Sequence, residues 1–243
     1  MRTPVSRMLM FFTVCIGGGS LVLFVYFLMF GAPLTLRIAR SEPARLAWDA
    51  LLCLVFFLQH SGMIRRGVKD RITRRIPAMV YPALYSIASG VALIALVLLW
   101  QPSDRFLWRL GDTERWLPAC VALVAVAGFV WGVRSLRCFD PFGRLALQAS
   151  TRGVTPPPLA FVAVGAYRVV RHPLYLFMLL LIWSTPRFPT DQLLFNGLWT
   201  LWIVMGTKLE ERDLVADFGE TYRRYQRSVP MLIPCPRPRR RRA

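Results

Sequence analysis

Hydrophobic residues in this chain form long runs that short polar segments separate. Several of the runs approach the roughly 20 residues that a helix needs to cross a bilayer. They cover about residues 8–30, 47–63, 81–100 and 117–133. The first run is too long for a signal-peptide core and further runs follow it, so we expect a retained membrane helix. Gly17, Gly18 and Gly19 within it would let a neighbouring helix approach closely.

A fifth apolar region is interrupted in its middle. Leu174–Trp183 and Leu193–Met205 are separated by residues 184–191, where two prolines and two charged residues predict a turn. The chain becomes polar after Lys208, and residues 209–227 keep an amphipathic helical pattern. The pattern therefore predicts an all-α, polytopic integral membrane protein. It would have four spanning helices, a C-terminal helical hairpin and a cytoplasmic amphipathic helix.

The charged residues also support a membrane protein. The chain has 31 Lys+Arg residues against 13 acids, which gives a net charge of +18. The basic residues lie in loops between apolar runs, which is typical of membrane proteins and argues against nucleic acid as a partner. The most basic connections and both termini are expected in the cytoplasm. Arg37, Arg40 and Arg45 in the first connection fit this orientation less well. The terminal run Arg239–Arg242 predicts a contact with anionic membrane lipid or an anchor for the topology.

The same features divide the chain into three parts. Residues 1–133 would hold the spanning helices, and residues 134–234 a cytoplasmic loop, the hairpin and the amphipathic helix. Residues 235–243 would form a basic tail. With two histidines and no CxxC spacing, no metal site is expected.

The stretch from Gly165 to Tyr175 carries the first candidate chemistry. Pro173 suits the first turn of a helix, so His172 is expected at the N-cap. Backbone N–H groups and the positive end of the helix dipole would then be available to hold a carboxylate. The alternative is that Arg171 and His172 only mark the membrane interface, with Tyr175 in an aromatic belt.

A pair of carboxylates follows the hairpin. On an ideal helix over residues 210–227, Glu211 falls near the middle of an apolar stripe and Glu210 at its edge. The stripe consists of Leu214, Val215, Phe218, Tyr222 and Tyr225, and we interpret the two tyrosines as packing residues. A carboxylate there needs a cationic partner. That partner could be a ligand ammonium group, or Arg171 or Arg168 in a structural ion pair.

Together the two segments offer donors for a carboxylate, a carboxylate for an ammonium group, and aromatic rings. These groups would fit the amino-acid end of S-adenosylmethionine, whose sulfonium favours aromatic faces, although many zwitterions would fit as well.

Several spaced motifs carry a family resemblance. Residues 165–175, Glu210-Glu211, residues 218–225 and Val229–Pro234 resemble the C-terminal half of the isoprenylcysteine carboxyl methyltransferase superfamily. Two further motifs resemble the bacterial membrane methanethiol S-methyltransferases and the related nitric-oxide-reductase-associated membrane proteins. These motifs are Gln59–Met63 and Phe139–Gly143. The segments 209–215 and 229–234 favour the methanethiol enzymes.

The resemblance implies an S-adenosylmethionine pocket on the cytoplasmic side, with Glu210 taking the amino group. Its lining would be Tyr167, His172, Pro173, Leu174, Tyr175 and Glu210. The helical wheel favours Glu211 instead, so both carboxylates stay candidates. The prenylcysteine enzymes carry a substrate-binding arginine one turn before Glu210, where this chain has Gly206. This difference leaves room for a small neutral thiol, and methanethiol would yield dimethyl sulfide.

Catalysis would depend on a thiolate, which is scarce for an ordinary thiol at neutral pH. Arg171, Lys208 or His60 could stabilise it or assist deprotonation, although His60 could also be a satisfied interhelical hydrogen-bonder. Two other functions stay open. One is a non-catalytic membrane accessory protein of nitric oxide metabolism, and the other is a methyltransferase acting on a hydrophobic carboxylate or amine.

Overall fold

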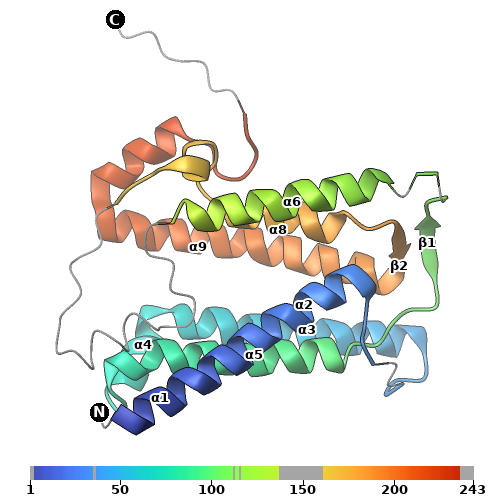
Figure 1. Ribbon diagram of the computed structural model, residues 1–243, viewed down its shortest axis with the longest axis horizontal. Helices are drawn as coiled ribbons and strands as arrows, with labels where there is room; N and C mark the ends of the chain where they lie inside the picture. The colour runs from blue at the N-terminus through green and yellow to red at the C-terminus, as the bar shows by residue number, and fades with distance from the viewer. Residues whose placement is uncertain (1–2, 35–36, 112, 115, 137–160, 236–243) are drawn as a thin grey trace, which may run out of the picture. The chain divides into compact units, whose positions relative to one another are not determined.

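The computed structural model describes residues 3–34, 37–111, 113–114, 116–136 and 161–235. The Phe139–Gly143 motif and the arginine run Arg239–Arg242 lie outside the described residues. The chain divides into two compact units (Figure 1). Of the described residues, unit 1 holds 3–34, 37–107 and 188–198, and unit 2 holds 108–111, 113–114, 116–136, 161–187 and 199–235.

Among the described residues, 4 helical stretches are long and apolar enough to cross a membrane. They are Arg7–Phe30, Glu42–Ile64, Ala78–Leu98 and Trp116–Arg134. Each overlaps one of the runs identified from the hydrophobic pattern, so the expected fold class is confirmed. The protein is a helical, multi-pass membrane protein.

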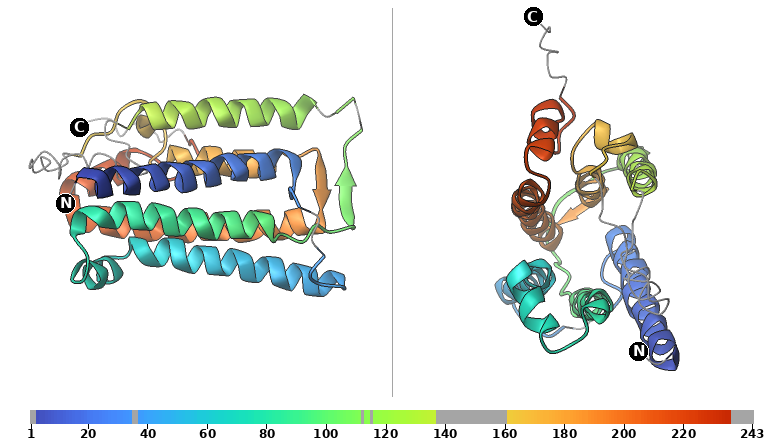
Figure 2. Two further views of the ribbon diagram at one scale, coloured as in Figure 1. Left: turned by 60° about the horizontal axis from the view of Figure 1, so that its bottom comes forward. Right: turned by 90° about the vertical axis from the view of Figure 1, so that its left-hand side faces the viewer.

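Unit 1 is built around α5. Its helices are α1 (Thr3–Phe12), η1 (Thr13–Gly18), α2 (Gly19–Phe30), α3 (Glu42–Ile64), α4 (Arg66–Thr73), η2 (Ala78–Val80) and α5 (Tyr81–Leu98). Helix α5 packs against α3 and against η1 and α2 (Figure 2). A Cβ at Gly90 would lie 3.0 Å from the Ile16 backbone oxygen, and Gly17 on the facing segment is buried. Glycines on both sides therefore permit the close approach, as expected for helices that pack in a membrane.

An aromatic cluster closes one end of unit 1. The rings of Phe24, Phe27, Trp100 and Phe195 are all buried, and the Phe27 ring meets those of Trp100 and Phe195 edge-on. The indole N–H of Trp100 also donates to Asp191 Oδ2 at 2.9 Å. These contacts fix the first turns of α9 (Thr190–Ser228) against the ends of α2 and α5.

Unit 2 contains α6 (Trp116–Arg134), η3 (Gly165–Arg168), α8 (Pro173–Trp183) and the later part of α9. Helix α6 packs closely on α8. A Cβ at Gly128 would overlap the Phe177 ring, and one at Gly132 would lie 2.7 Å from Leu174 Cδ2. With 11 residues, α8 is about 16 Å long, which is short of the roughly 30 Å hydrocarbon core.

The connection between the hairpin arms differs from the expected turn. Residues Arg187–Pro189 form a short strand, β2, that pairs with β1 (Phe106–Arg109). The second arm begins at Thr190 and continues past Lys208, because the polar residues that follow Lys208 do not interrupt the helix. The break comes later, at Gly219, whose φ of 54° and ψ of −129° are non-helical and are tolerated by glycine.

Candidate functional site

The turn before α8 presents two buried side chains toward α9. Gly165 opens η3 with a φ of 54°, in a position where a Cβ would collide with Ser135 Oγ. The chain then reaches Arg171 and His172, and Pro173 begins α8 with His172 as its N-cap residue. The His172 side chain does not cap the helix. Its Nε2 lies 3.3 Å from Glu211 Oε1 on α9 instead.

Arg171 and Glu211 form a buried ion pair. Arg171 Nε lies 2.5 Å from Glu211 Oε1, and the two side chains keep 7% and 12% of their surface exposed. Gln226 Nε2 donates to the other carboxylate oxygen at 3.1 Å. The structure thus gives Glu211 an internal cationic partner, which was one of the two possibilities for a carboxylate on the apolar stripe. It also shows that Arg171 does more than mark an interface.

The segment after α9 is bound back to this turn through backbone carbonyls. Arg171 Nη1 donates to the carbonyls of Gln226 and Val229 at 3.0 and 2.6 Å. The backbone N–H groups of Arg171 and His172 donate to Pro230 and Met231 at 2.9 and 3.1 Å. These two amides, which precede the first turn of α8, are therefore bonded within the protein.

Glu210 has a different environment from its neighbour. Its Oε2 accepts a hydrogen bond from the Tyr175 hydroxyl at 2.9 Å and lies 3.7 Å from His172 Nδ1. The rings of His172 and Tyr175 are nearly parallel, with centroids 5.6 Å apart. The Glu210 side chain is 46% exposed, so its carboxylate can still meet a ligand.

The non-helical backbone at Gly219 changes which side chains of α9 lie on the same face of the helix. Beyond it, Tyr222 and Tyr225 pack with Phe161, which also contacts the Phe218 ring. The Tyr225 hydroxyl donates to the Tyr167 carbonyl at 2.5 Å, and Tyr222 is 1% exposed. Both tyrosines are therefore packing residues that support the turn carrying Tyr167.

Burial and charge set the protonation states at this site. Burial lowers the pKa of His172 below its usual 6.5, against the opposing charges of Glu210 and Glu211. For Glu211, burial raises the pKa, but the hydrogen bond and charge of Arg171 outweigh it, so the pKa falls below 4.5. Burial raises the pKa of Tyr167 to about 12, helped by the charge of Glu210. At neutral pH, His172 is therefore neutral and Glu211 is charged.

Lys208 lies close to this cluster, on the same helix. It lines an open pocket of about 410 Å³ together with Glu211, Arg212, Val215 and Gln226. Because Arg171 balances the charge of Glu211, the side chains of Lys208 and Arg212 make this pocket positive. A Cβ at Gly206, one turn before Glu210, would meet nothing within 4 Å.

His60 lies on α3 in unit 1, and its ring forms hydrogen bonds with α5, the helix that packs on α3. Its nitrogens lie 3.0 to 3.2 Å from the hydroxyls of Tyr85 and Ser89, and its ring stacks on Phe56. These contacts are those of an interhelical hydrogen-bonder, and a catalytic role for His60 stays a prediction.

The structure brings most of the expected site residues together in unit 2. Around α8 and α9 it groups Tyr167, Arg171, His172, Pro173, Leu174, Tyr175, Lys208, Glu210 and Glu211. The expectations from the sequence missed Gln226 and the carbonyls of Val229–Met231 as bonding partners. A backbone carbonyl leaves no signal in the sequence, and Gln226 was one polar residue among many.

The fold and the site define a multi-pass helical membrane protein with a carboxylate-containing cluster where a short apolar helix begins. The family model described as "NnrU protein" matches residues 50–229, and the chain belongs to this family.

Relatives with assigned names are similar over most of their length. The Methanethiol S-methyltransferase of Pseudomonas deceptionensis is 38% identical over 80% of this chain and 74% of its own. The protein of that name from a second Pseudomonas strain is 36% identical over 79% and 74%. Methanethiol S-methyltransferase 2 of Bradyrhizobium diazoefficiens is 34% identical over 76% and 72%. The resemblance to this group is thereby confirmed. No solved structure matches the chain.

Proposed function

We propose that this protein is an S-adenosylmethionine-dependent methyltransferase that methylates the sulfur of a small thiol, converting methanethiol to dimethyl sulfide. The observation that carries the proposal is the Glu210 carboxylate, half exposed beside Tyr175 and His172, while its neighbour Glu211 is neutralised by Arg171. The names of the relatives support the thiol acceptor. The basic loops support a cytoplasmic site. The bacterial sources of these relatives support a bacterial inner membrane.

The residues around Glu210 fit the proposed methyl donor. An ammonium group is a strong partner for a half-exposed carboxylate, and Tyr175 already holds one oxygen of that carboxylate in place. Neutral His172 and the parallel Tyr175 ring offer aromatic surface of the kind that attracts a sulfonium. Tyr167, Pro173 and Leu174 complete the proposed lining on either side of the turn. S-Adenosylmethionine would supply an activated methyl group on a positively charged sulfur.

Among the candidate catalytic residues, the contacts favour Lys208 as the group that supports the thiolate. Arg171 is committed to Glu211 and two carbonyls, so we propose that it is a positioning residue. Within the described part of the chain, no hydrogen bond or ion pair engages the exposed Lys208 ammonium. In the reaction the thiol proton leaves to solvent or a base, the thiolate forms the new carbon–sulfur bond, and the donor becomes a neutral thioether.

The proposal is tested by incubating membranes that contain the protein with methyl-labelled S-adenosylmethionine and methanethiol. Labelled dimethyl sulfide should appear in the headspace above these membranes and not above membranes without the protein. Lys208→Gln should lower kcat/KM at neutral pH about tenfold and shift the rate profile toward higher pH, whereas Arg212→Gln in the same pocket should keep the parent profile.

Two other outcomes would replace the proposal. Label in a non-volatile lipid-phase product would indicate a hydrophobic carboxylate or amine acceptor. No label in any product, together with no binding of S-adenosylmethionine, would indicate a non-catalytic membrane protein.

A further inference from the structure

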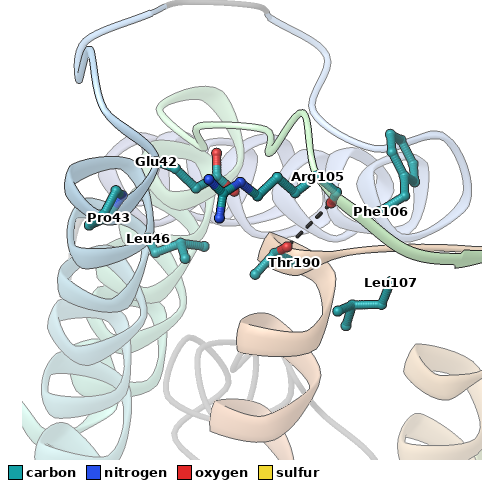
Figure 3. A pocket seen from close by; sticks show the side chains of 7 residues that line it. All are labelled: Glu42, Pro43, Leu46, Arg105, Phe106, Leu107 and Thr190. Carbon is teal, nitrogen blue, oxygen red and sulfur yellow. Dashed lines mark hydrogen bonds between the residues drawn. The ribbon is translucent and has the colours of Figure 1, made fainter.

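A second pocket lies in unit 1, at the beginning of a membrane-spanning helix. It has a volume of about 640 Å³ and is lined by Glu42, Pro43, Leu46, Arg105, Phe106, Leu107 and Thr190. In Figure 3 the Arg105 side chain extends toward the first turns of α3, and Thr190 of α9 lies beneath the Arg105 backbone. The Thr190 N–H donates to the Arg105 carbonyl at 3.0 Å, which holds the two segments together.

The acidic group of this pocket is already neutralised. Glu42 pairs with Arg45 at 2.6 Å and accepts a hydrogen bond from the Ser103 hydroxyl. Arg45 also binds Asp104 at 3.0 Å, and Asp104 in turn pairs with Arg37. Glu42 therefore adds little net negative charge to the pocket.

Arg105 contrasts with these paired groups. Its backbone is hydrogen-bonded, but within the described residues its guanidinium has no hydrogen bond or ion pair. The side chain is exposed at the pocket, and its charge is not balanced there. The pocket thus combines one uncompensated guanidinium with the apolar side chains of Pro43, Leu46, Phe106 and Leu107.

The depth of the pocket in the membrane follows from α3. Glu42 and Pro43 begin the span Glu42–Ile64, so the pocket lies where that span meets the headgroup region. A guanidinium at this depth binds phosphate oxygens in bidentate geometry, and apolar walls suit the first carbons of an acyl chain.

We propose that this pocket binds a membrane phospholipid, with the phosphodiester on Arg105 and the upper acyl chain against Leu46 and Leu107. A free phosphate would use the guanidinium but leave the apolar wall exposed to water, which is why the lipid is the better fit. The site is separate from the proposed methyl-transfer residues and does not depend on that activity.

The test uses the purified full-length chain in detergent and measures retained lipid by native mass spectrometry. Phosphatidylglycerol should bind, whereas a diacylglycerol with the same acyl chains, which lacks the phosphoglycerol headgroup, should not. Arg105→Gln should lower the apparent affinity for phosphatidylglycerol about tenfold, as expected for loss of a charged hydrogen-bond donor. Leu46→Trp, which fills the pocket without changing charge, should lower it as well.

Arg40→Gln is the matched control, because Arg40 is an exposed arginine of the connection before α3 and does not line the pocket. It should leave the affinity within about twofold of the parent, since exposed charges contribute little. Equal losses in Arg40→Gln and Arg105→Gln would overturn the proposal, because they would indicate unspecific attraction. Equal binding of diacylglycerol, or displacement of the lipid by inorganic phosphate, would overturn it too.

Discussion

Arg171 Nε and Glu211 Oε1 lie 2.5 Å apart, in a pair that joins the turn before α8 to the middle of α9. The same guanidinium donates to the carbonyls of Gln226 and Val229, where α9 ends. One side chain thus ties together three segments that are far apart in the sequence. The pair also distinguishes the adjacent acids, because Glu211 is used within the protein whereas the Glu210 carboxylate stays half exposed beside Tyr175, where we propose that it meets the ligand.

Arg171→Gln should destabilise the protein, because it leaves the Glu211 charge buried without its partner. Loss of one member of a buried pair costs about 3–5 kcal/mol of the free energy of unfolding. Thermal unfolding in detergent should show a clear fall in Tm. Arg227→Gln is the control, since Arg227 pairs with Glu220 at a site where both side chains are more than half exposed. Its Tm should stay at the parent value, and a similar Tm for both variants would contradict a structural role for Arg171.

The adjacent acids should respond oppositely to neutralisation. Glu210→Gln should weaken binding of S-adenosylmethionine about tenfold or more and leave Tm unchanged, because a charged hydrogen-bond partner of the ligand is lost. Glu211→Gln should lower Tm, because it removes the charge that balances Arg171. Isothermal titration calorimetry and thermal unfolding on the same preparations separate the two effects. Parent affinity in Glu210→Gln would remove Glu210 from the cofactor site.

Stability should fall as the pH becomes acidic, and His172 should contribute the first part of the fall. Its pKa is lowered by burial, so the unfolded chain takes up a proton near pH 6.5 while folded His172 stays neutral. Stability is therefore fully present above that pH and declines below it. The lowered pKa of Glu211 adds a second loss below its usual 4.5, for the same reason.

The measurement is Tm between about pH 8 and pH 4 for the parent and for His172→Asn. The variant should lose the part of the decline that begins near pH 6.5 and keep the part below 4.5. Identical pH profiles would show that His172 is protonated alike in the folded and unfolded chains.

His60→Ala should lower Tm and leave the rate of thiol methylation per folded molecule unchanged. The reason is that the ring bonds to Tyr85 and Ser89 and stacks on Phe56 within unit 1. Tyr85→Phe provides the control, since it removes one of these hydrogen bonds and leaves the imidazole in place. A large loss of rate at unchanged Tm in His60→Ala would instead make His60 part of the reaction.

Hydropathy and a few special residues were enough to predict most of the architecture. Apolar runs of spanning length can only be satisfied in a bilayer by helices, so the four spans follow from composition along the chain. Pro173 predicted the start of α8 because its missing N–H is not needed in the first helical turn. The segments around Arg171-His172 and Glu210-Glu211 were identified as the chemical part of the chain, and they do lie together.

The tertiary structure decided how those groups are used. An ideal helical wheel placed Glu211 on the apolar stripe, where its charge needs a cationic partner. The wheel could not show whether a ligand or an arginine pairs with it, because the partner, Arg171, lies about 40 positions away in the sequence. The wheel also assumed a straight helix, whereas the helix breaks at Gly219. Beyond this break the Tyr225 hydroxyl reaches the Tyr167 carbonyl. The carbonyls of Val229–Met231 reach the turn before α8. Periodicity in a sequence reports which side of a helix is apolar. The identity of the group that neutralises a buried charge depends on which distant segment packs against that side of the helix.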